Sequence, residues 1–85
     1  MRHRLTESDI LIALLLAGDS SPQTIANMMD RHPGSISRTG SELVDQGLIV
    51  KKPRYVYALT PKGFSAARTS LRRRAESPIS PVADR

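Results

Sequence analysis

The binding chemistry available to this sequence lies mainly in its cations. Residues 46–75 contain eight lysine and arginine side chains and no carboxylate, whereas residues 5–45 hold two arginines against six carboxylates. Lys51, Lys52 and Arg54 place three cations within four residues, beside Tyr55. Because one-sided positive charge attracts polyanions, this distribution is typical of a polyanion-binding protein. The alternatives are a solvated basic helix with no partner and a charged turn that protects a strand edge.

Other kinds of site find no support in these 85 residues. There is no cysteine, and His3 and His32 lie far apart without a metal-ligand spacing. No Ser/His/Asp set, carboxylate pair or phosphate-binding loop is present. We therefore expect a single small domain that is not an enzyme and uses no metal and no cofactor.

The longest apolar run, Ile10 to Ala17, spans eight residues, whereas a membrane span needs about 20. No signal peptide precedes it, and the lack of cysteine fits a reducing compartment. These features predict a soluble cytoplasmic protein, associated with the nucleoid if its polyanion is DNA.

The elements that would position the cations begin with a helix over residues 7–17. Thr6 is a suitable cap, Glu7 and Asp9 suit the first turn, and Gly18 marks the end. The helix is apolar nearly all round, which is more than one core-facing stripe requires. Either the rest of the chain or a second copy must cover its other side.

A second helix is predicted over residues 22–29. Ser21 is its cap, and Pro22 occupies the first helical position, where its missing N–H costs nothing. Ile25, Met28 and Met29 are three and four residues apart, so this helix has one apolar face.

The stretch from Arg31 to Ile49 is rich in serine and glycine, which ordinarily favour loops. Even so, Ile36, Gly40, Leu43 and Gly47 are spaced four, three and four apart, which is helical periodicity. We predict a third helix from Pro33 to Gln46, with Gly47 as a left-handed C-cap.

The runs LIVKK and YVYAL around Lys52-Pro53-Arg54 predict a small β-hairpin. Thr60 and Pro61 then open a fourth helix that is expected to end near Arg73. The predicted fold is α+β and mainly α, with a basic arm over residues 1–4, one domain over residues 5–73 and a disordered tail over residues 74–85.

This order of elements, with the signature L-x-x-x-G-L-I at Leu43 to Ile49 and Y-x-L-T-P-K-G at Tyr57 to Gly63, resembles the winged helix-turn-helix transcriptional regulators. It looks most like the small haloarchaeal phage-type repressors and, more distantly, the MarR-like regulators. The resemblance covers about residues 5–71. It implies a third helix in the DNA major groove, a second helix across the backbone and a basic hairpin wing on phosphate or the minor groove.

Residue by residue, the resemblance implies three sets of DNA contacts. On the recognition helix these are Ser35, Ser37, Arg38 and Ser41, with Arg38 as the base reader because its guanidinium can bond guanine bidentately. The wing contacts are Lys51, Lys52, Arg54 and Tyr55, and the backbone contacts of the second helix are Gln23 and Thr24. Surface-filling serines and simple helix capping are the alternatives for the hydroxyl residues.

The leading hypothesis is a dimeric repressor that binds double-stranded DNA sequence-specifically, with no membrane partner and no small-molecule effector. The excess of apolar residues in the first helix, together with Phe64 and Leu71 in the fourth, suggests the dimer residues Ile10, Leu14, Phe64 and Leu71. The alternative is a winged-helix protein-interaction module without DNA readout, and RNA is a further candidate despite the few aromatic side chains. Gly40 departs from the aliphatic residue usual in the family, and Glu42 would repel phosphate.

Overall fold

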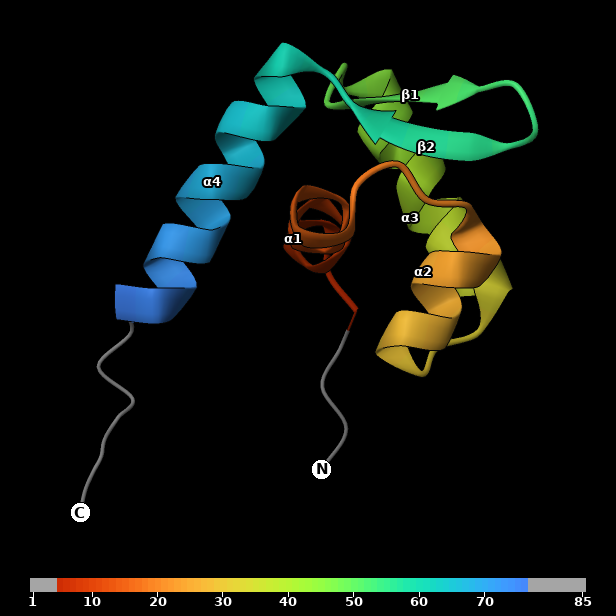
Figure 1. Ribbon diagram of the computed structural model, residues 1–85, viewed down its shortest axis with the longest axis horizontal. Helices are drawn as coiled ribbons and strands as arrows, with labels where there is room; N and C mark the ends of the chain where they lie inside the picture. Colours follow the sequence, from red (N-terminus) through yellow and green to blue (C-terminus); the bar gives the residue numbers. More distant parts are fainter. Residues whose placement is uncertain (1–4, 77–85) are drawn as a thin grey trace.

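The computed structural model describes residues 5–76, which form four helices and a two-stranded antiparallel hairpin (Figure 1). This confirms the predicted α+β winged-helix architecture. The elements in chain order are α1 (Glu7–Ala17), α2 (Pro22–Met29), α3 (Pro33–Asp45), β1 (Ile49–Lys52), β2 (Val56–Leu59) and α4 (Pro61–Glu76).

The first three helices begin at the residues that the sequence predicted. Each start is fixed by a hydrogen bond between residues that are close together in the sequence. The Thr6 hydroxyl accepts from the Asp9 amide, while the Asp9 carboxylate accepts from the Thr6 amide at 2.9 Å. Ser21 caps α2 through the Thr24 amide. His32 caps α3, since its Nδ1 accepts from the Gly34 amide at 3.0 Å. All three contacts lie within three residues along the chain.

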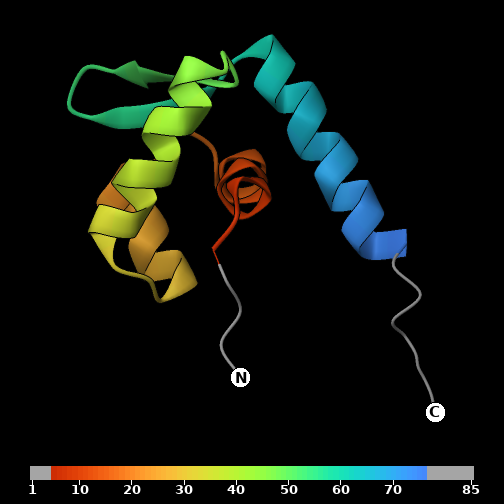
Figure 2. The same cartoon turned by 180° about the vertical axis from the view of Figure 1, so that it is seen from behind.

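Helix α1 is the central element of the fold. Figures 1 and 2 show it end-on, with α4 on one side and α2, α3 and the hairpin on the other. Neighbours on several sides explain why α1 is apolar nearly all round. Ile10 and Leu14 are only 0% and 2% exposed and belong to the core of the single chain. The prediction that these two residues form a dimer surface is therefore wrong.

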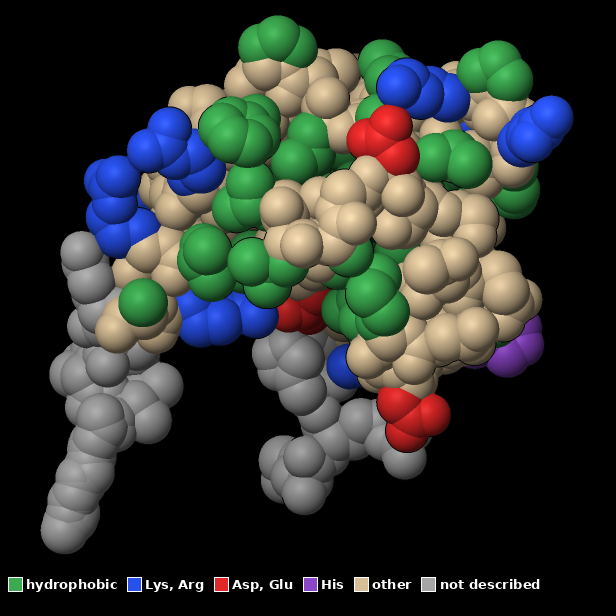
Figure 3. Space-filling view, viewed as in Figure 1, with side chains coloured by type: hydrophobic (Ala, Val, Ile, Leu, Met, Phe, Trp, Pro, Cys, Tyr) green, Lys and Arg blue, Asp and Glu red, His purple; other side chains and the backbone are tan. Residues whose placement is uncertain are grey.

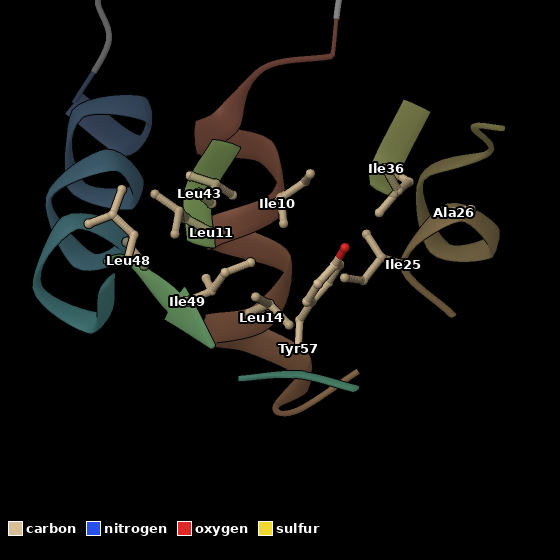
Figure 4. Packing of buried hydrophobic residues seen from close by; sticks show 11 residues of the cluster. Ile10, Leu11, Leu14, Ile25, Ala26, Ile36, Leu43, Leu48, Ile49 and Tyr57 are labelled. Atoms are coloured by element: carbon tan, nitrogen blue, oxygen red, sulfur yellow. The ribbon is translucent and has the colours of Figure 1, made fainter. Parts of the chain in front are cut away.

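The core joins α1 to the hairpin and to the α2–α3 pair through one aromatic side chain. Tyr57 on β2 points between the helices toward Ile25 and Ile36 (Figure 4), and it is 2% exposed. Ile10 and Leu14 of α1 lie on the other side of the ring in the same cluster. A single tyrosine thus sets the position of the hairpin against three helices.

The hairpin pairs Ile49 with Leu59 and Lys52 with Val56. Its turn contains Arg54 and Tyr55, whose φ values of 69° and 61° are both left-handed. Such angles are uncommon for residues other than glycine, so the turn is narrowly defined. β2 also pairs with Ser20, whose amide and carbonyl both bond the backbone of Tyr57.

Helix α4 crosses α1 and is held to it beyond the predicted end of the domain. The Arg74 guanidinium donates to the Asp9 carboxylate at 3.0 Å, and the Asp9 side chain is only 5% exposed. Ser70 lies 3.2 Å from Ser8 through their hydroxyl oxygens. The helix therefore continues to Glu76, which corrects the prediction that the disordered tail begins at residue 74. The predicted arm, residues 1–4, and residues 77–85 lie outside the described range.

Candidate nucleic-acid interface

The outer face of α3 carries a group of polar side chains. Ile36, Gly40 and Leu43 are buried, as the periodicity predicted. Ser35, Arg38 and Ser41 are exposed, and their side chains make no hydrogen bond or ion pair with another residue in the range 5–76. Their donors are therefore available to a partner.

Ser37 differs from these three residues because it lies where α3 meets the wing. It is half-buried, and its hydroxyl oxygen is 3.4 Å from that of Tyr55 at the wing turn. The rings of Tyr55 and Tyr57 lie near each other, with centroids 6.2 Å apart. Ser37 thus contacts the protein itself and is the least available of the four predicted α3 residues.

The surroundings of Tyr57 change the pKa of its hydroxyl group. Burial of the ring is the main cause that raises the pKa of Tyr57 above its ordinary value of 10.0, and Tyr55 adds to the increase through charge and hydrogen bonding. A hydrogen bond with Ser37 acts in the opposite direction. Tyr57 is accordingly neutral at physiological pH.

The three cations of the wing have different surroundings. Lys52 donates to the Asp19 carboxylate at 3.0 Å, so its charge is partly neutralised within the chain. The Lys51 ammonium lies 4.7 Å from the centroid of the Tyr55 ring, a cation–π arrangement. Arg54 is exposed in the turn of the hairpin. Figure 3 shows positive side chains both over the hairpin and along α4.

The predicted backbone contacts on α2 are exposed and held by short local bonds. The Gln23 amide donates to Asn27 at 3.1 Å, and the Thr24 hydroxyl lies 3.0 Å from that of Ser21. Because these bonds are solvent-exposed, they hold the two side chains only weakly. Both residues remain on the surface beside α3.

Gly40 has a packing role that depends on Tyr57. A Cβ at residue 40 would lie 2.6 to 2.8 Å from the hydroxyl oxygen, Cζ and Cε2 of the Tyr57 ring. The space left by the missing side chain is thus filled by tyrosine from β2. Met28 on α2, by contrast, is 49% exposed and does not fill this space.

Sequence reasoning missed a second set of positioning residues at the other end of α3. The Thr60 hydroxyl lies 2.7 Å from the carbonyl oxygen of Gly47, and the Lys62 ammonium lies 3.1 Å from that of Gln46. Both residues belong to the LTPKG segment, from which the sequence predicts the start of α4 and the family resemblance but no contact with the end of α3. The polar Thr60 and Lys62 beside a glycine were the available signal.

Exposed apolar side chains lie on α1 and α4. Leu16 is 70% exposed and Phe64 is 47% exposed, while Leu71 is half-buried. The Arg68 guanidinium covers part of the Phe64 ring at 5.8 Å from its centroid. Phe64 and Leu71 therefore remain accessible to a second chain, unlike the two α1 residues predicted with them.

Within residues 5–76, no group of three histidine or acidic side chains is arranged to hold a metal ion. In the same range, no helix has both the length and the apolar character that crossing a membrane requires.

The chain matches no protein-family profile and no curated protein sequence. It does resemble solved structures. Transcriptional regulator Tm0710 from Thermotoga maritima has a TM-score of 0.70 at 20% identity, covering 81% of this chain and 52% of that one. ZitR from Lactococcus lactis has a TM-score of 0.74 at 23% identity, covering 91% and 56%.

ZitR in complex with DNA gives a TM-score of 0.68 at 24% identity, covering 91% of this chain and 57% of that one. The present chain spans about half the length of each of these structures. At these identities the likeness shows a shared fold, the winged helix, and no more.

Proposed function

We propose that this protein is a transcriptional regulator that binds double-stranded DNA sequence-specifically, and that it acts as a dimeric repressor. The observation that carries the proposal is the exposed face of α3, where Ser35, Arg38 and Ser41 have no partner within residues 5–76. A helix fits the major groove, and an arginine there can bond guanine with two parallel hydrogen bonds.

In this proposal α3 enters the major groove and Arg38 reads a base. Ser35 and Ser41 donate to phosphate or base edges, and their small size lets the α3 backbone approach the DNA. Gln23 and Thr24 on α2 contact the DNA backbone. The shared fold with ZitR, one structure of which contains DNA, supports this mode of docking.

The wing contributes mainly through Arg54 and Lys51 in this proposal. Arg54 lies in the turn, and Lys51 stays exposed above Tyr55. Lys52 contributes less because Asp19 already neutralises part of its charge. Tyr55 supports Lys51 and contacts Ser37, so its role in binding is partly indirect.

A dimer would read two half-sites that are related by two-fold symmetry. Its contact surface is proposed to include Phe64 and Leu71 of α4, together with Leu16 of α1. Leu16 and Phe64 are among the most exposed large apolar side chains in the described range. Burial of such side chains is the main favourable term in association.

The test is a selection of DNA duplexes from a random library with the purified protein. We expect one preferred, roughly palindromic sequence, and an affinity that falls with salt at a log–log slope near −4 to −5 per protomer, for about five phosphate contacts. No preferred duplex, or an affinity independent of salt, would contradict the proposal. A protein-interaction module would instead retain a partner protein through Leu16 and Phe64 and show no DNA preference.

A further inference from the structure

The C-terminal end of α3 is held by the first turn of α4. The carbonyls at and just after the end of a helix have no partner within the helix and must find one elsewhere. Helix α3 ends at Asp45, and the consecutive carbonyls of the next three residues, Gln46, Gly47 and Leu48, accept from two residues that are more than ten positions further along the chain. Lys62 donates to Gln46 at 3.1 Å, and Thr60 donates to the next two carbonyls through its hydroxyl and its amide.

Gly63 makes this close approach possible. A Cβ at residue 63 would overlap the carbonyl oxygen of Leu48, so only glycine lets the two backbone segments lie against each other. The Gly63 amide also donates to the Thr60 hydroxyl at 3.0 Å, which fixes that hydroxyl in place. The first turn of α4 is therefore shaped around the end of α3.

Lys62 is well suited to this position by its charge. The carbonyl end of a helix carries partial negative charge, and an ammonium group stabilises it. Its hydrogen bond directs the ammonium to the carbonyl of Gln46, the C-cap of α3, whereas Ser35 lies in the first turn of the helix. The Gln46 side chain in turn donates to Glu7 of α1 at 2.8 Å.

We propose that the first turn of α4 positions the recognition helix, and that Lys62 is a positioning residue for sequence selection rather than a phosphate contact. This inference rests on the proposed DNA-binding function. Because α4 is also tied to α1 by Arg74 and Ser70, a change in how α4 packs would pass to α3 through Lys62 and Thr60. A second copy that docks on Phe64 would act on the same helix.

The test compares Lys62→Gln with Arg72→Gln, because each removes one positive charge from an exposed site on α4. The probes are the duplex recovered by selection and a scrambled duplex of the same length. Relative to Arg72→Gln, we expect Lys62→Gln to bind the selected duplex about five- to tenfold more weakly, as the net loss of one solvent-exposed hydrogen bond predicts. Affinity for the scrambled duplex and the salt slope should match those of Arg72→Gln, and Lys62→Arg should restore selectivity.

Two outcomes would overturn the inference. An equal loss on both duplexes, with a salt slope smaller by about one, would make Lys62 a phosphate contact. Selectivity equal to that of Arg72→Gln would show that its bond to Gln46 does not position α3.

Hydrogen exchange of the free protein tests the same point without DNA. The amides of Gly47 and Leu48, which bond Val44 and Leu43 at 3.0 Å, should exchange severalfold faster in Lys62→Gln than in Arg72→Gln. Unchanged exchange would contradict positioning by Lys62. If the wild-type protein selects no duplex, the proposed function fails, while this measurement still decides whether Lys62 holds the end of α3.

Discussion

The Tyr57 ring occupies the volume that a side chain at Gly40 would need, with its hydroxyl oxygen 2.6 Å from the position of a Cβ there. This pair fixes how closely the hairpin approaches α3. It also links the most unusual residue of α3 to the buried tyrosine at the centre of the core.

Gly40→Ala should lower the free energy of unfolding, although alanine is the better helix former. Helix propensity favours alanine by about 1 kcal/mol, whereas overpacking a well-filled site costs about 1 to 3 kcal/mol. The contacts with Tyr57 are with a ring fixed by burial, so the packing cost should be larger. Urea denaturation of both proteins measures the difference.

The control is the same change in a Tyr57→Leu background, where the ring tip is gone. There Gly40→Ala should become stabilising because only the helix propensity remains. A destabilisation of equal size in both backgrounds would show that Tyr57 does not set the cost.

Arg38→Ala and Arg54→Ala should affect DNA binding in different ways. Loss of a bidentate base contact at Arg38 should reduce discrimination between the selected and scrambled duplexes by about 1 to 3 kcal/mol. Loss of a phosphate contact at Arg54 should lower the affinity for both duplexes alike and reduce the salt slope by about one. Fluorescence anisotropy at several salt concentrations separates the two, and identical behaviour would argue against readout by α3.

Asp19→Asn should release Lys52 from its ion pair at 3.0 Å and strengthen DNA binding at low salt. Both side chains are about half exposed, so the fold should lose less than about 1 kcal/mol. Asp45→Asn makes the same change in net charge without touching Lys52. If both variants bind DNA equally, the effect is one of net charge and not of the freed lysine.

Stability should fall at alkaline pH because of Tyr57. Its folded-state pKa is raised above the ordinary value of 10.0, so the folded chain holds this proton more tightly than the unfolded chain does. The resulting stabilisation is complete below pH 10.0 and is lost as pH rises through the folded-state pKa. Melting temperatures between about pH 8 and pH 11 should fall less steeply for Tyr57→Phe than for the wild type. The exposed Tyr55 provides the comparison, since Tyr55→Phe should retain most of the decline.

Arg74→Met should destabilise the fold although residue 74 lies beyond the domain end that the sequence predicted. The buried Asp9 carboxylate would lose one of its partners, the Arg74 guanidinium at 3.0 Å, while the methionine keeps part of the apolar stem. Because the arginine is itself about half exposed, we expect about 1 to 2 kcal/mol in urea denaturation. Arg73→Met, one position earlier on the exposed surface, should change stability much less.

Local chemistry explains what the sequence could predict. The bounds of α1 and α2 follow from Thr6 and Ser21, whose caps involve residues three positions away. Likewise, the buried line of α3 follows from the spacing of Ile36, Gly40 and Leu43.

Contacts between distant residues were not predictable in the same way. The sequence of an all-apolar helix does not show which side faces its neighbours. Ile10 and Leu14 were therefore predicted at a dimer surface, whereas they lie in the core of the single chain. The Lys52–Asp19 pair and the Arg74–Asp9 pair join residues 33 and 65 positions apart. The periodicity of a sequence gives no information on pairs that are so far apart. The fit of Tyr57 into the space at Gly40 likewise depends on how β2 packs against α3.

The exposed positions of α3 suggest a use for the molecule as an engineering scaffold. The contacts that fix the helix come from the buried Ile36, Gly40 and Leu43, from Ser37 and from the carbonyl end, so none involves the side chains of Ser35, Arg38 or Ser41. Randomising those three positions should leave melting temperature nearly constant across a library. The binding preference could then be changed while the fold stays the same. Library members should express and fold as the original protein does.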